Sequence, residues 1–301
     1  MNTTAKRSLR KGCILTLFGG ILWGLSGTCG QYLLQVKGLT SDWLVPVRLL
    51  TAGFLLLLVC WFKDGREIFA LWKVPGDVRD IIIFGIVGMS MCQYSYFTAI
   101  GYSNAGTATV LQYTGPVLIM LYVSFRAGKM PEKSELAAVA LALLGTFFLA
   151  AHGNMKSLAV SGRALFWGLG SAVALAVYTT QPGRLLDKYG SMAVTAWGMV
   201  IGGAVLCLIF KPWNIRAAVD GAVIGGMAVI ILAGTIIAFV CYLEGVKCVG
   251  PKRGSLFAAV EPVSATVFSV IFMNVSFGTM DLLGFVCIIS TIFLLTLGKG
   301  R

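Results

Sequence analysis

The stretch YFTAIGYSNAGTATVLQYTGP at residues 96–116 aligns without gaps on YLEGVKCVGPKRGSLFAAVEP at residues 242–262, so a tyrosine begins both stretches and a proline ends both. A Trp-Gly pair also recurs, at residues 23–24 and 167–168, and these two pairs are nearly as far apart along the chain as the two stretches are. Recurrence at one offset is typical of an internal repeat. We therefore expect the chain to contain two copies of one structural unit.

The composition predicts that most of the chain lies in lipid. Of the 301 residues, 57% are hydrophobic and only 12% are charged, and the mean hydropathy is +0.87. A soluble core of this size does not bury so much apolar surface. The apolar residues form runs of about 20, the length of a helix that crosses the hydrocarbon core, and no strand-like alternation is present. We predict an all-α integral membrane protein.

Ten apolar runs are predicted to be transmembrane helices. They cover residues 12–34, 42–62, 80–102, 104–125, 134–152, 162–182, 190–210, 220–246, 250–273 and 279–298. Because five helices separate equivalent positions, an odd number, the second copy must enter the bilayer upside down relative to the first. The prediction is a 5+5 inverted-topology repeat, with one copy in residues 1–152 and the other in residues 153–301.

Inverted symmetry predicts a mechanism. If the two copies hold slightly different conformations, exchanging these conformations turns an inward-open cavity into an outward-open one. Alternating access then follows from the arrangement of the chain. The alternative, that the duplication left a static bundle, stays open.

The basic residues predict the orientation. With the N-terminus in the cytoplasm, most of the 24 Lys and Arg residues fall in cytoplasmic loops, and positively charged loops resist translocation. We expect a multi-pass protein of the plasma (inner) membrane with both termini in the cytoplasm. The longest cytoplasmic loop, residues 63–79, mixes apolar and charged residues, which favours a short helix in the membrane interface.

Three stretches, in this order, resemble the EamA type of the drug/metabolite transporter superfamily. They are VPVRLLTAGFLLLL at residues 45–58, AIGYSNAGTATVLQYTGPVLIML at 99–121 and GVKCVGPKRGSLFAAVEPVSATVF at 245–268. The resemblance implies ten helices in two copies, and the export or import of small metabolites such as amino acids, amines and organic cations. It also implies a central cavity lined mainly by spans one, three, four, six, eight and nine.

Glu261 is an ionisable residue near the middle of span nine. A charge at this depth costs ~2.5–3.5 kcal/mol on insertion scales, so such residues have a function or a specific partner. Pro262 lacks a backbone donor and is expected to loosen the helix beside it. Three roles are open for Glu261: a ligand for a cationic or amino group, a carrier of a coupling proton, or a carboxyl group that hydrogen-bonds between helices.

Two further ionisable residues are candidates for coupling or gating. Arg48 lies near the outer end of span two, where it can snorkel to the interface, pair with a carboxylate or contact an anionic substrate. Glu244 lies near the cytoplasmic end of span eight, and its helical spacing to Lys247 favours an ion pair. This pair is interpreted either as a gate or as a simple surface pair.

Polar and aromatic side chains at mid-depth are the candidate substrate-binding residues. An apolar cavity with a few hydrogen-bonding groups holds small organic solutes, and aromatic faces attract an ammonium group. Besides Glu261, the candidates are Trp23, Gln93, Tyr96, Gln112, Tyr113, Trp167, Tyr178 and Tyr242.

Glycine is frequent, with 37 residues. Small residues let helix backbones approach closely. Close contacts between helices are therefore expected at the glycine pairs 20 and 24, 202 and 203, and 221 and 225.

The sequence argues against several other classes of protein. Every aspartate lies in a loop or at the end of a span, and a single histidine cannot form a metal cluster, so we expect no enzyme, no metal site and no cofactor. No Walker-type GxxxxGK[ST] motif is present, which argues against ATP-driven transport. The basic residues lie in loops as topology signals, so nucleic acid is not an expected partner.

The predicted function is a secondary transporter of amino acids, amines or related small metabolites, with export favoured, embedded in a lipid bilayer. A non-transporting membrane receptor or a channel-like facilitator is the alternative. The residues leave open whether a proton or another cation is coupled, and whether the protein is a monomer or a homodimer.

Overall fold

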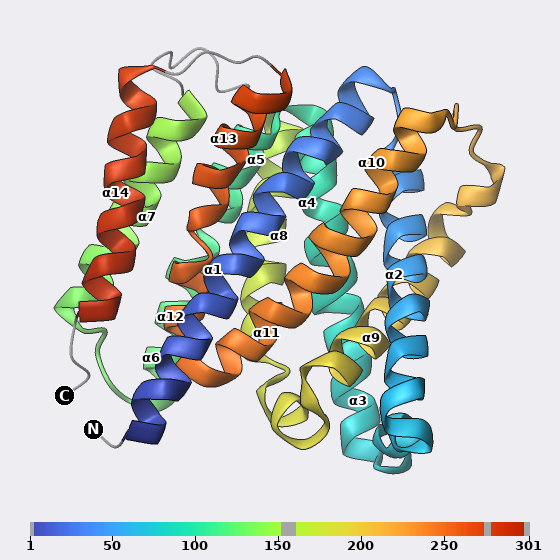
Figure 1. Ribbon diagram of the computed structural model, residues 1–301, viewed down its shortest axis with the longest axis horizontal. Coiled ribbons are helices and arrows are strands. Elements are labelled where there is room, and N and C mark those ends of the chain that lie inside the picture. The colour runs from blue at the N-terminus through green and yellow to red at the C-terminus, as the bar shows by residue number, and fades with distance from the viewer. Residues whose placement is uncertain (1–2, 152–160, 274–277, 298–301) are drawn as a thin grey trace.

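The computed structural model describes residues 3–151, 161–273 and 278–297, and within these ranges every regular element is a helix (Figure 1). The expected boundary between the two copies, at residues 152 and 153, lies outside the described residues.

The helices follow one another along the chain with short connections. In order, they are α1 (Thr3–Gln31), η1 (Tyr32–Val36), α2 (Ser41–Asp64), η2 (Gly65–Lys73), α3 (Pro75–Ile83), η3 (Phe84–Ser90), α4 (Met91–Tyr102), α5 (Ala105–Gln112), α6 (Gly115–Ala127), α7 (Lys133–Ala151), α8 (Gly162–Thr180), α9 (Gly183–Phe210), η5 (Pro212–Asn214), α10 (Gly221–Ile231), η6 (Leu232–Ile237), α11 (Ala238–Val249), α12 (Pro251–Phe257), α13 (Val260–Met273) and α14 (Thr279–Leu297).

Helices occupy all ten ranges in which we predicted spans, as far as these ranges are described. Within the described ranges, seven helical runs are long and apolar enough to cross a membrane: Ser8–Val36, Ser41–Lys73, Pro75–Tyr102, Ala105–Ala127, Gly183–Phe210, Gly221–Val249 and Pro251–Phe272. The helices α7, α8 and α14 are not among these seven. The described part of the chain is therefore all-helical, with several helices suited to crossing a membrane, and the number of ten crossings stays a prediction.

Helices of the first half pack against helices of the second half in matching pairs. Helix α1 packs along α11 and α13, while α8 packs along α4, α5 and α6. Helix α2 packs against α9, and α7 packs against α14 (Figure 1). If positions five spans apart are equivalent, the contacts of α1 with α11 and α13 have counterparts in the contacts of α8 with α4 and α6.

Two predicted spans are broken at equivalent places. The breaks fall at residues 113–114, between α5 and α6, and at residues 258–259, between α12 and α13. Pro116 and Pro262 lie in the first turn of the following helix, where a proline is tolerated because the N–H that it lacks has no intrahelical partner. Spans three and eight each contain a π-helical segment, η3 and η6, a feature that often marks a functional site.

Close helix contacts occur at only some of the predicted glycines. A Cβ atom added at Gly24 would lie 2.6 Å from the carbonyl oxygen of Glu261, and one at Gly203 would lie 2.6 Å from a backbone nitrogen of α2. At Gly221 and Gly225, nothing in the described part of the chain lies within 4 Å of an added Cβ. The prediction for these two was wrong because they face open space.

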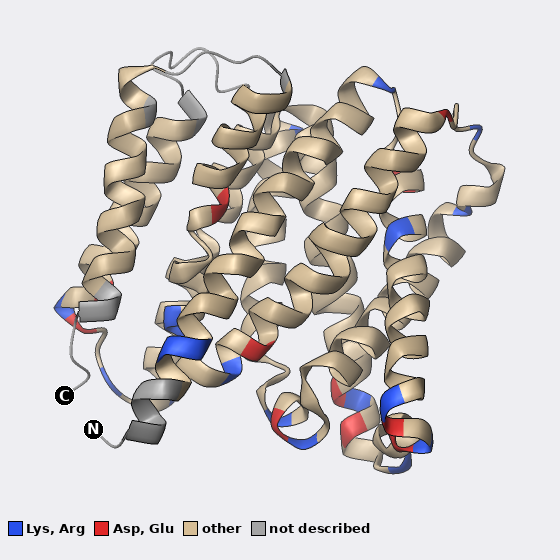
Figure 2. Cartoon of the chain, in the orientation of Figure 1, with Lys and Arg blue, Asp and Glu red and all other residues tan. Residues whose placement is uncertain are grey.

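Charged residues gather at the two ends of the bundle and are densest at the lower end in Figure 2, where α3 and α9 begin. The loop at residues 63–79 contains the predicted short helix, η2. Ile68 and Leu71 are buried, whereas Phe69 and Trp72 are 41% and 39% exposed. The helix is thus two-sided, and its position in the membrane interface stays a prediction.

Candidate functional site

A cavity lies inside the bundle, between α1, α2, α4, α5, α6, α8, α11, α12 and α13. The volume of the cavity, counted as the space that the centre of a water molecule can occupy, is about 40 Å³. On this measure one water molecule needs about 10–15 Å³, so the cavity holds only a few waters in this conformation. A larger solute can enter only when the helices move apart.

Most of the residues proposed for binding line this one cavity. They are Trp23, Gln93, Tyr96, Gln112, Tyr113, Tyr178, Tyr242 and Glu261, and Arg48 lines it as well. Sequence reasoning missed other lining residues, among them Ser26, Cys92, Phe97, Leu175 and Ser255. These residue types are common in the interior of any helical membrane bundle, so the sequence contains no signal that singles them out.

Glu261 is buried on α13, with 6% of its surface exposed. Its Oε1 accepts a hydrogen bond from the Tyr96 hydroxyl at 3.3 Å, and its Oε2 accepts one from the Tyr113 hydroxyl at 3.3 Å. Both hydroxyls have a closer partner: Tyr113 donates to the Ala258 carbonyl at 2.6 Å, and Tyr96 lies 2.9 Å from Thr109 Oγ1. Because a hydroxyl has one proton to donate, the carboxylate is only weakly satisfied.

Arg48 is buried on α2, with 1% of its surface exposed. Snorkelling to the interface was therefore a wrong expectation, because the side chain turns into the cavity. Its Nη2 donates to Gln93 Oε1, and its guanidinium carbon lies 4.4 Å from the centre of the Phe97 ring. Its Nε and Nη1 have no hydrogen-bond partner among the described residues, and no ion pair joins Arg48 to a described carboxylate.

Aromatic rings form another wall of the cavity. The ring centre of Trp23 lies 4.7 Å from that of Tyr242, which stacks on Tyr178 at 5.8 Å. The Tyr242 hydroxyl is held 3.0 Å from Thr179 Oγ1. Trp23 Nε1 and the Tyr178 hydroxyl are buried without a hydrogen-bond partner in the described ranges. This wall offers ring faces and donors to a bound solute.

Trp167 and Pro262 are two of the three proposed residues that do not line the cavity. Trp167 packs edge-on against Tyr94, with 5.4 Å between the ring centres. Pro262 is buried beside Glu261 and follows the break before α13, so it shapes the backbone there instead of presenting a binding group.

Glu244 also lies outside the cavity lining, and its partner differs from the expected one. Its Oε1 lies 3.1 Å from Lys11 Nζ of α1, and its Oε2 accepts from the Ser191 hydroxyl of α9 at 3.0 Å. Lys247 donates instead to the Leu186 carbonyl at 3.3 Å, because the start of α9 lies beside this end of α11. The predicted pair of Glu244 with Lys247 was therefore wrong.

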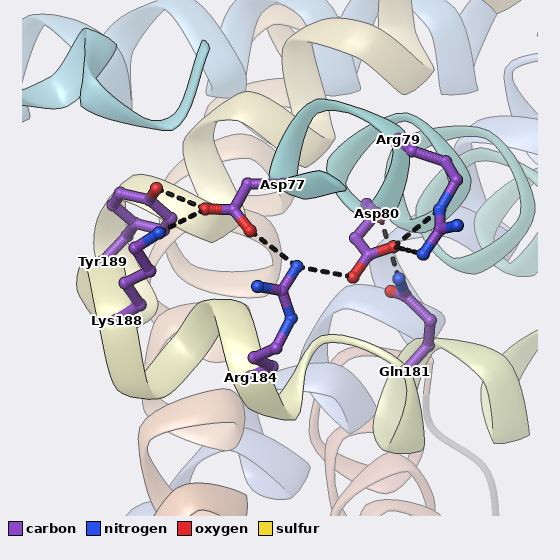
Figure 3. A network of polar contacts seen from close by, with 7 residues as sticks. All are labelled: Asp77, Arg79, Asp80, Gln181, Arg184, Lys188 and Tyr189. Atoms are coloured by element: carbon purple, nitrogen blue, oxygen red, sulfur yellow. Dashed lines mark hydrogen bonds and ion pairs between the residues drawn. The ribbon is translucent and has the colours of Figure 1, made fainter. Parts of the chain in front are cut away.

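A polar network joins α3 to α9 at the lower end of the bundle (Figure 3). Asp77 is fully buried, with Oδ1 2.6 Å from Arg184 Nη2 and Oδ2 2.6 Å from Lys188 Nζ. The Tyr189 hydroxyl donates to Asp77 at 2.5 Å, and Arg184 also reaches Asp80 at 2.9 Å. We call Asp77, Asp80, Arg184, Lys188 and Tyr189 the lower network.

A second ion pair lies at the other end of the bundle, where α10 begins. Lys37, which follows η1, places its Nζ 2.6 Å from Asp220 Oδ2. Asp220 also caps α10 by accepting the Val223 N–H at 2.8 Å. The hydrogen bond from Lys37 lowers the pKa of the Asp220 carboxyl, and the same bond raises the pKa of Lys37. We call Lys37 and Asp220 the upper pair.

Among the described residues, no group of three or more His, Cys, Asp and Glu side chains is placed to hold a metal ion. The cavity instead offers one buried cation, one buried carboxylate, ring faces and free donors. Such groups suit the reversible binding of a small polar solute.

Comparisons with known proteins find a matching family and several related transporters. The EamA-like transporter family matches residues 10–151 and, a second time, residues 162–297. YicL of Salmonella typhimurium, an uncharacterized inner membrane transporter, is 37% identical over 294 residues, which are 98% of each chain. RhtA of Escherichia coli, a threonine/homoserine exporter, is 27% identical over 241 residues, which are 78% of this chain and 75% of RhtA.

A solved crystal structure shares the fold, with a TM-score of 0.75 and 18% identity over 96% of this chain and 99% of the other. The family match and the similarity to YicL extend over nearly the whole chain and confirm the resemblance seen in the three stretches. The chain belongs to the EamA-like transporter family.

Proposed function

We propose that the protein is a secondary transporter that exports an amino acid or a related small metabolite by alternating access. The observation that supports this most strongly is the central cavity, in which Arg48 and Glu261 are buried without being paired to each other. Charges within membrane-spanning helices are costly and are retained where they serve a function. A polar solute that enters the cavity would meet both groups.

Two copies of opposite topology would provide a route to alternating access, and the packing supports two such copies. The contacts of α1 with α11 and α13 correspond to those of α8 with α4, α5 and α6. The two broken spans also fall at corresponding places, and so do η3 and η6, two of the three π-helical segments in the described residues. We propose ten membrane crossings in two inverted copies, residues 1–152 and 153–301, with both termini in the cytoplasm.

The ion pairs at the two ends fit the same scheme. The upper pair joins the end of span one to the start of span eight, and the lower network joins the region after span six to the start of span three. Spans one and six are equivalent, as are spans three and eight. We propose that the two sites are corresponding gates, and that each opens when its charges separate.

The substrate class is proposed from the site and from one relative. The cavity contains both a buried cation and a buried anion, a combination that suits amino-acid-sized polar solutes. RhtA is a threonine/homoserine exporter, and 27% identity over 241 residues makes amino acids the first solutes to test.

The proposal is tested with the purified full chain in proteoliposomes. Uptake of radiolabelled threonine, homoserine, leucine and small amines is measured with and without a pH gradient, and again with a sodium gradient. We expect saturable uptake of at least one amino acid above that of protein-free liposomes. Arg126→Gln serves as a control because Arg126 is exposed and, among the described residues, hydrogen-bonds to Tyr122 alone. Absence of all uptake, together with stepwise ionic currents, would overturn the proposal in favour of a channel.

A further inference from the structure

We propose that the cavity binds its substrate as a zwitterion, with a carboxylate on Arg48 and an ammonium group on Glu261, so that α-amino acids are preferred over amines and over carboxylic acids. This inference rests on the proposed transport function. It goes beyond it by assigning one end of the solute to each of the two charged residues.

The Arg48 end of the cavity requires an acceptor. A guanidinium group has only donors, and two of its three nitrogens are buried without a hydrogen-bond partner in the described structure. The partner of the third, Gln93 Oε1, is an uncharged amide oxygen. Trp23 Nε1 also lines the cavity as a buried donor without a partner. A carboxylate, with two oxygens in the geometry of the guanidinium fork, satisfies such donors.

The Glu261 end requires a donor. An ionised carboxylate only accepts hydrogen bonds, and the two hydroxyls that reach Glu261 at 3.3 Å each have a closer partner. An ammonium group has three donors and a full positive charge, so it compensates the carboxylate far better than a shared hydroxyl does.

The two charges do not compensate each other. Arg48 lies on α2 and Glu261 on α13, and no ion pair joins them in the described structure. Tyr96 lines the cavity with both, and its hydroxyl bonds to the Glu261 carboxylate. The site is therefore dipolar.

Charge balance selects the solute. Leaving a buried charge without a counter-ion is strongly unfavourable. An amine would pair with Glu261 and leave Arg48 uncompensated, whereas a carboxylic acid would do the reverse. An α-amino acid carries both charges at neutral pH, because its carboxyl group is ionised and its amino group is protonated. It compensates both residues at once, and the rings of Trp23, Tyr178 and Tyr242 remain to contact its side chain.

The test compares matched solutes on the wild-type full-length protein in detergent, where permeation through lipid does not interfere. Threonine is compared with 1-aminopropan-2-ol and 3-hydroxybutanoate, leucine with 3-methylbutylamine and 4-methylpentanoate, and phenylalanine with phenethylamine and 3-phenylpropanoate. Binding is measured by isothermal titration calorimetry. For the best-bound amino acid, we expect both partners to bind about tenfold more weakly or worse, the equivalent of one lost charge contact.

Two variants assign the ends of the solute. Arg48→Gln should weaken binding of the amino acid and of the acid about tenfold but not that of the amine, while Glu261→Gln should weaken binding of the amino acid and of the amine but not that of the acid. Arg126→Gln removes an exposed arginine and should change none of the three. Arg48→Lys keeps the charge and should recover part of the binding lost in Arg48→Gln.

The inference is overturned if an amine or an acid binds as tightly as its amino acid, or if no amino acid binds. Since the comparison is made first on the wild-type protein, it does not depend on the folding of a variant. If such a binding result is found and the protein still takes up a metabolite in the proteoliposome assay, the zwitterion inference is overturned but the proposed transport function stands. Absence of all uptake, together with stepwise ionic currents, would overturn the proposed function instead.

Discussion

Lys37 and Asp220 form an ion pair of 2.6 Å at the upper end of the bundle, and the pair of Arg184 with Asp77 has the same length at the lower end. Lys37 follows span one and pairs with Asp220 at the start of span eight, while Arg184 follows span six and pairs with Asp77 just before span three. Spans one and six are equivalent in the predicted repeat, and so are spans three and eight. Two inverted copies would place corresponding contacts at opposite ends in this way. The two sites can therefore be perturbed separately.

Breaking the upper pair should open only the upper end of the bundle, and breaking the lower network should open only the lower end. Spin labels at Val36→Cys and Val219→Cys, two exposed positions, report on the upper end, and labels at Gly76→Cys and Gly183→Cys, where an added Cβ meets open space, report on the lower end. Pulsed electron paramagnetic resonance should show longer upper distances in Asp220→Asn. It should show longer lower distances in Asp77→Asn. Lengthening at both ends in either variant would argue against separate gates.

The upper pair should be insensitive to pH in the physiological range. The pKa of the Asp220 carboxyl in the folded protein is lowered below its usual 3.8 by the hydrogen bond from Lys37, so the pair is fully present above that value. It is lost only as the pH falls through the lowered pKa. The label distance across the upper end should stay constant from about pH 8 to about pH 5 and lengthen in stronger acid. A change near pH 7 would assign the titration to another group.

Gly24 should not tolerate a side chain. A Cβ there would lie 2.6 Å from the Glu261 carbonyl oxygen and 2.7 Å from the Ala265 nitrogen, and backbone atoms cannot move aside cheaply. Overpacking of this kind costs about 1–3 kcal/mol, so Gly24→Ala should lower the thermal unfolding temperature in detergent by several degrees. Gly225→Ala, at a helical glycine with open space around it, is the matched control and should leave that temperature unchanged or slightly higher. Equal effects would contradict the close contact of α1 with α13.

The two tryptophans of the repeated Trp-Gly pair should differ in function. Trp23 lines the cavity, whereas Trp167 packs against Tyr94 outside the lining. An aromatic contact contributes about 0.5–1.5 kcal/mol, so Trp23→Phe should weaken substrate binding about two- to tenfold. Trp167→Phe should leave the binding constant unchanged. An equal loss in both would mean that Trp167 reaches the solute in another conformation.

Much of the fold could be predicted from the sequence because lipid imposes a simple rule. A run of about 20 apolar residues has to be a helix, so all ten predicted ranges are helical as far as they are described. The breaks at residues 113–114 and 258–259 also had a signal, the repeated proline just after each. The π-helical segments had none, since they depend on how neighbouring helices pack.

The site was harder to predict because depth in the membrane does not determine which way a side chain faces. Arg48 was considered for the interface and instead turns into the cavity, and Trp167 was expected in the cavity and lies outside it. The partner of Glu244 is Lys11, which is distant in sequence, and not Lys247 on the same helix. Tertiary contacts decide such cases, and a single sequence does not reveal them.

The central claim is that one cavity opens in turn to each side of the membrane. It is tested most directly with a variant that keeps Cys92, a buried lining residue, as its sole cysteine. In sealed vesicles of each orientation, a membrane-impermeant thiol reagent should label Cys92 from both faces, more slowly when the transported amino acid is present. Labelling from one face only, in the parent variant and after adding Asp77→Asn or Asp220→Asn, would contradict alternating access.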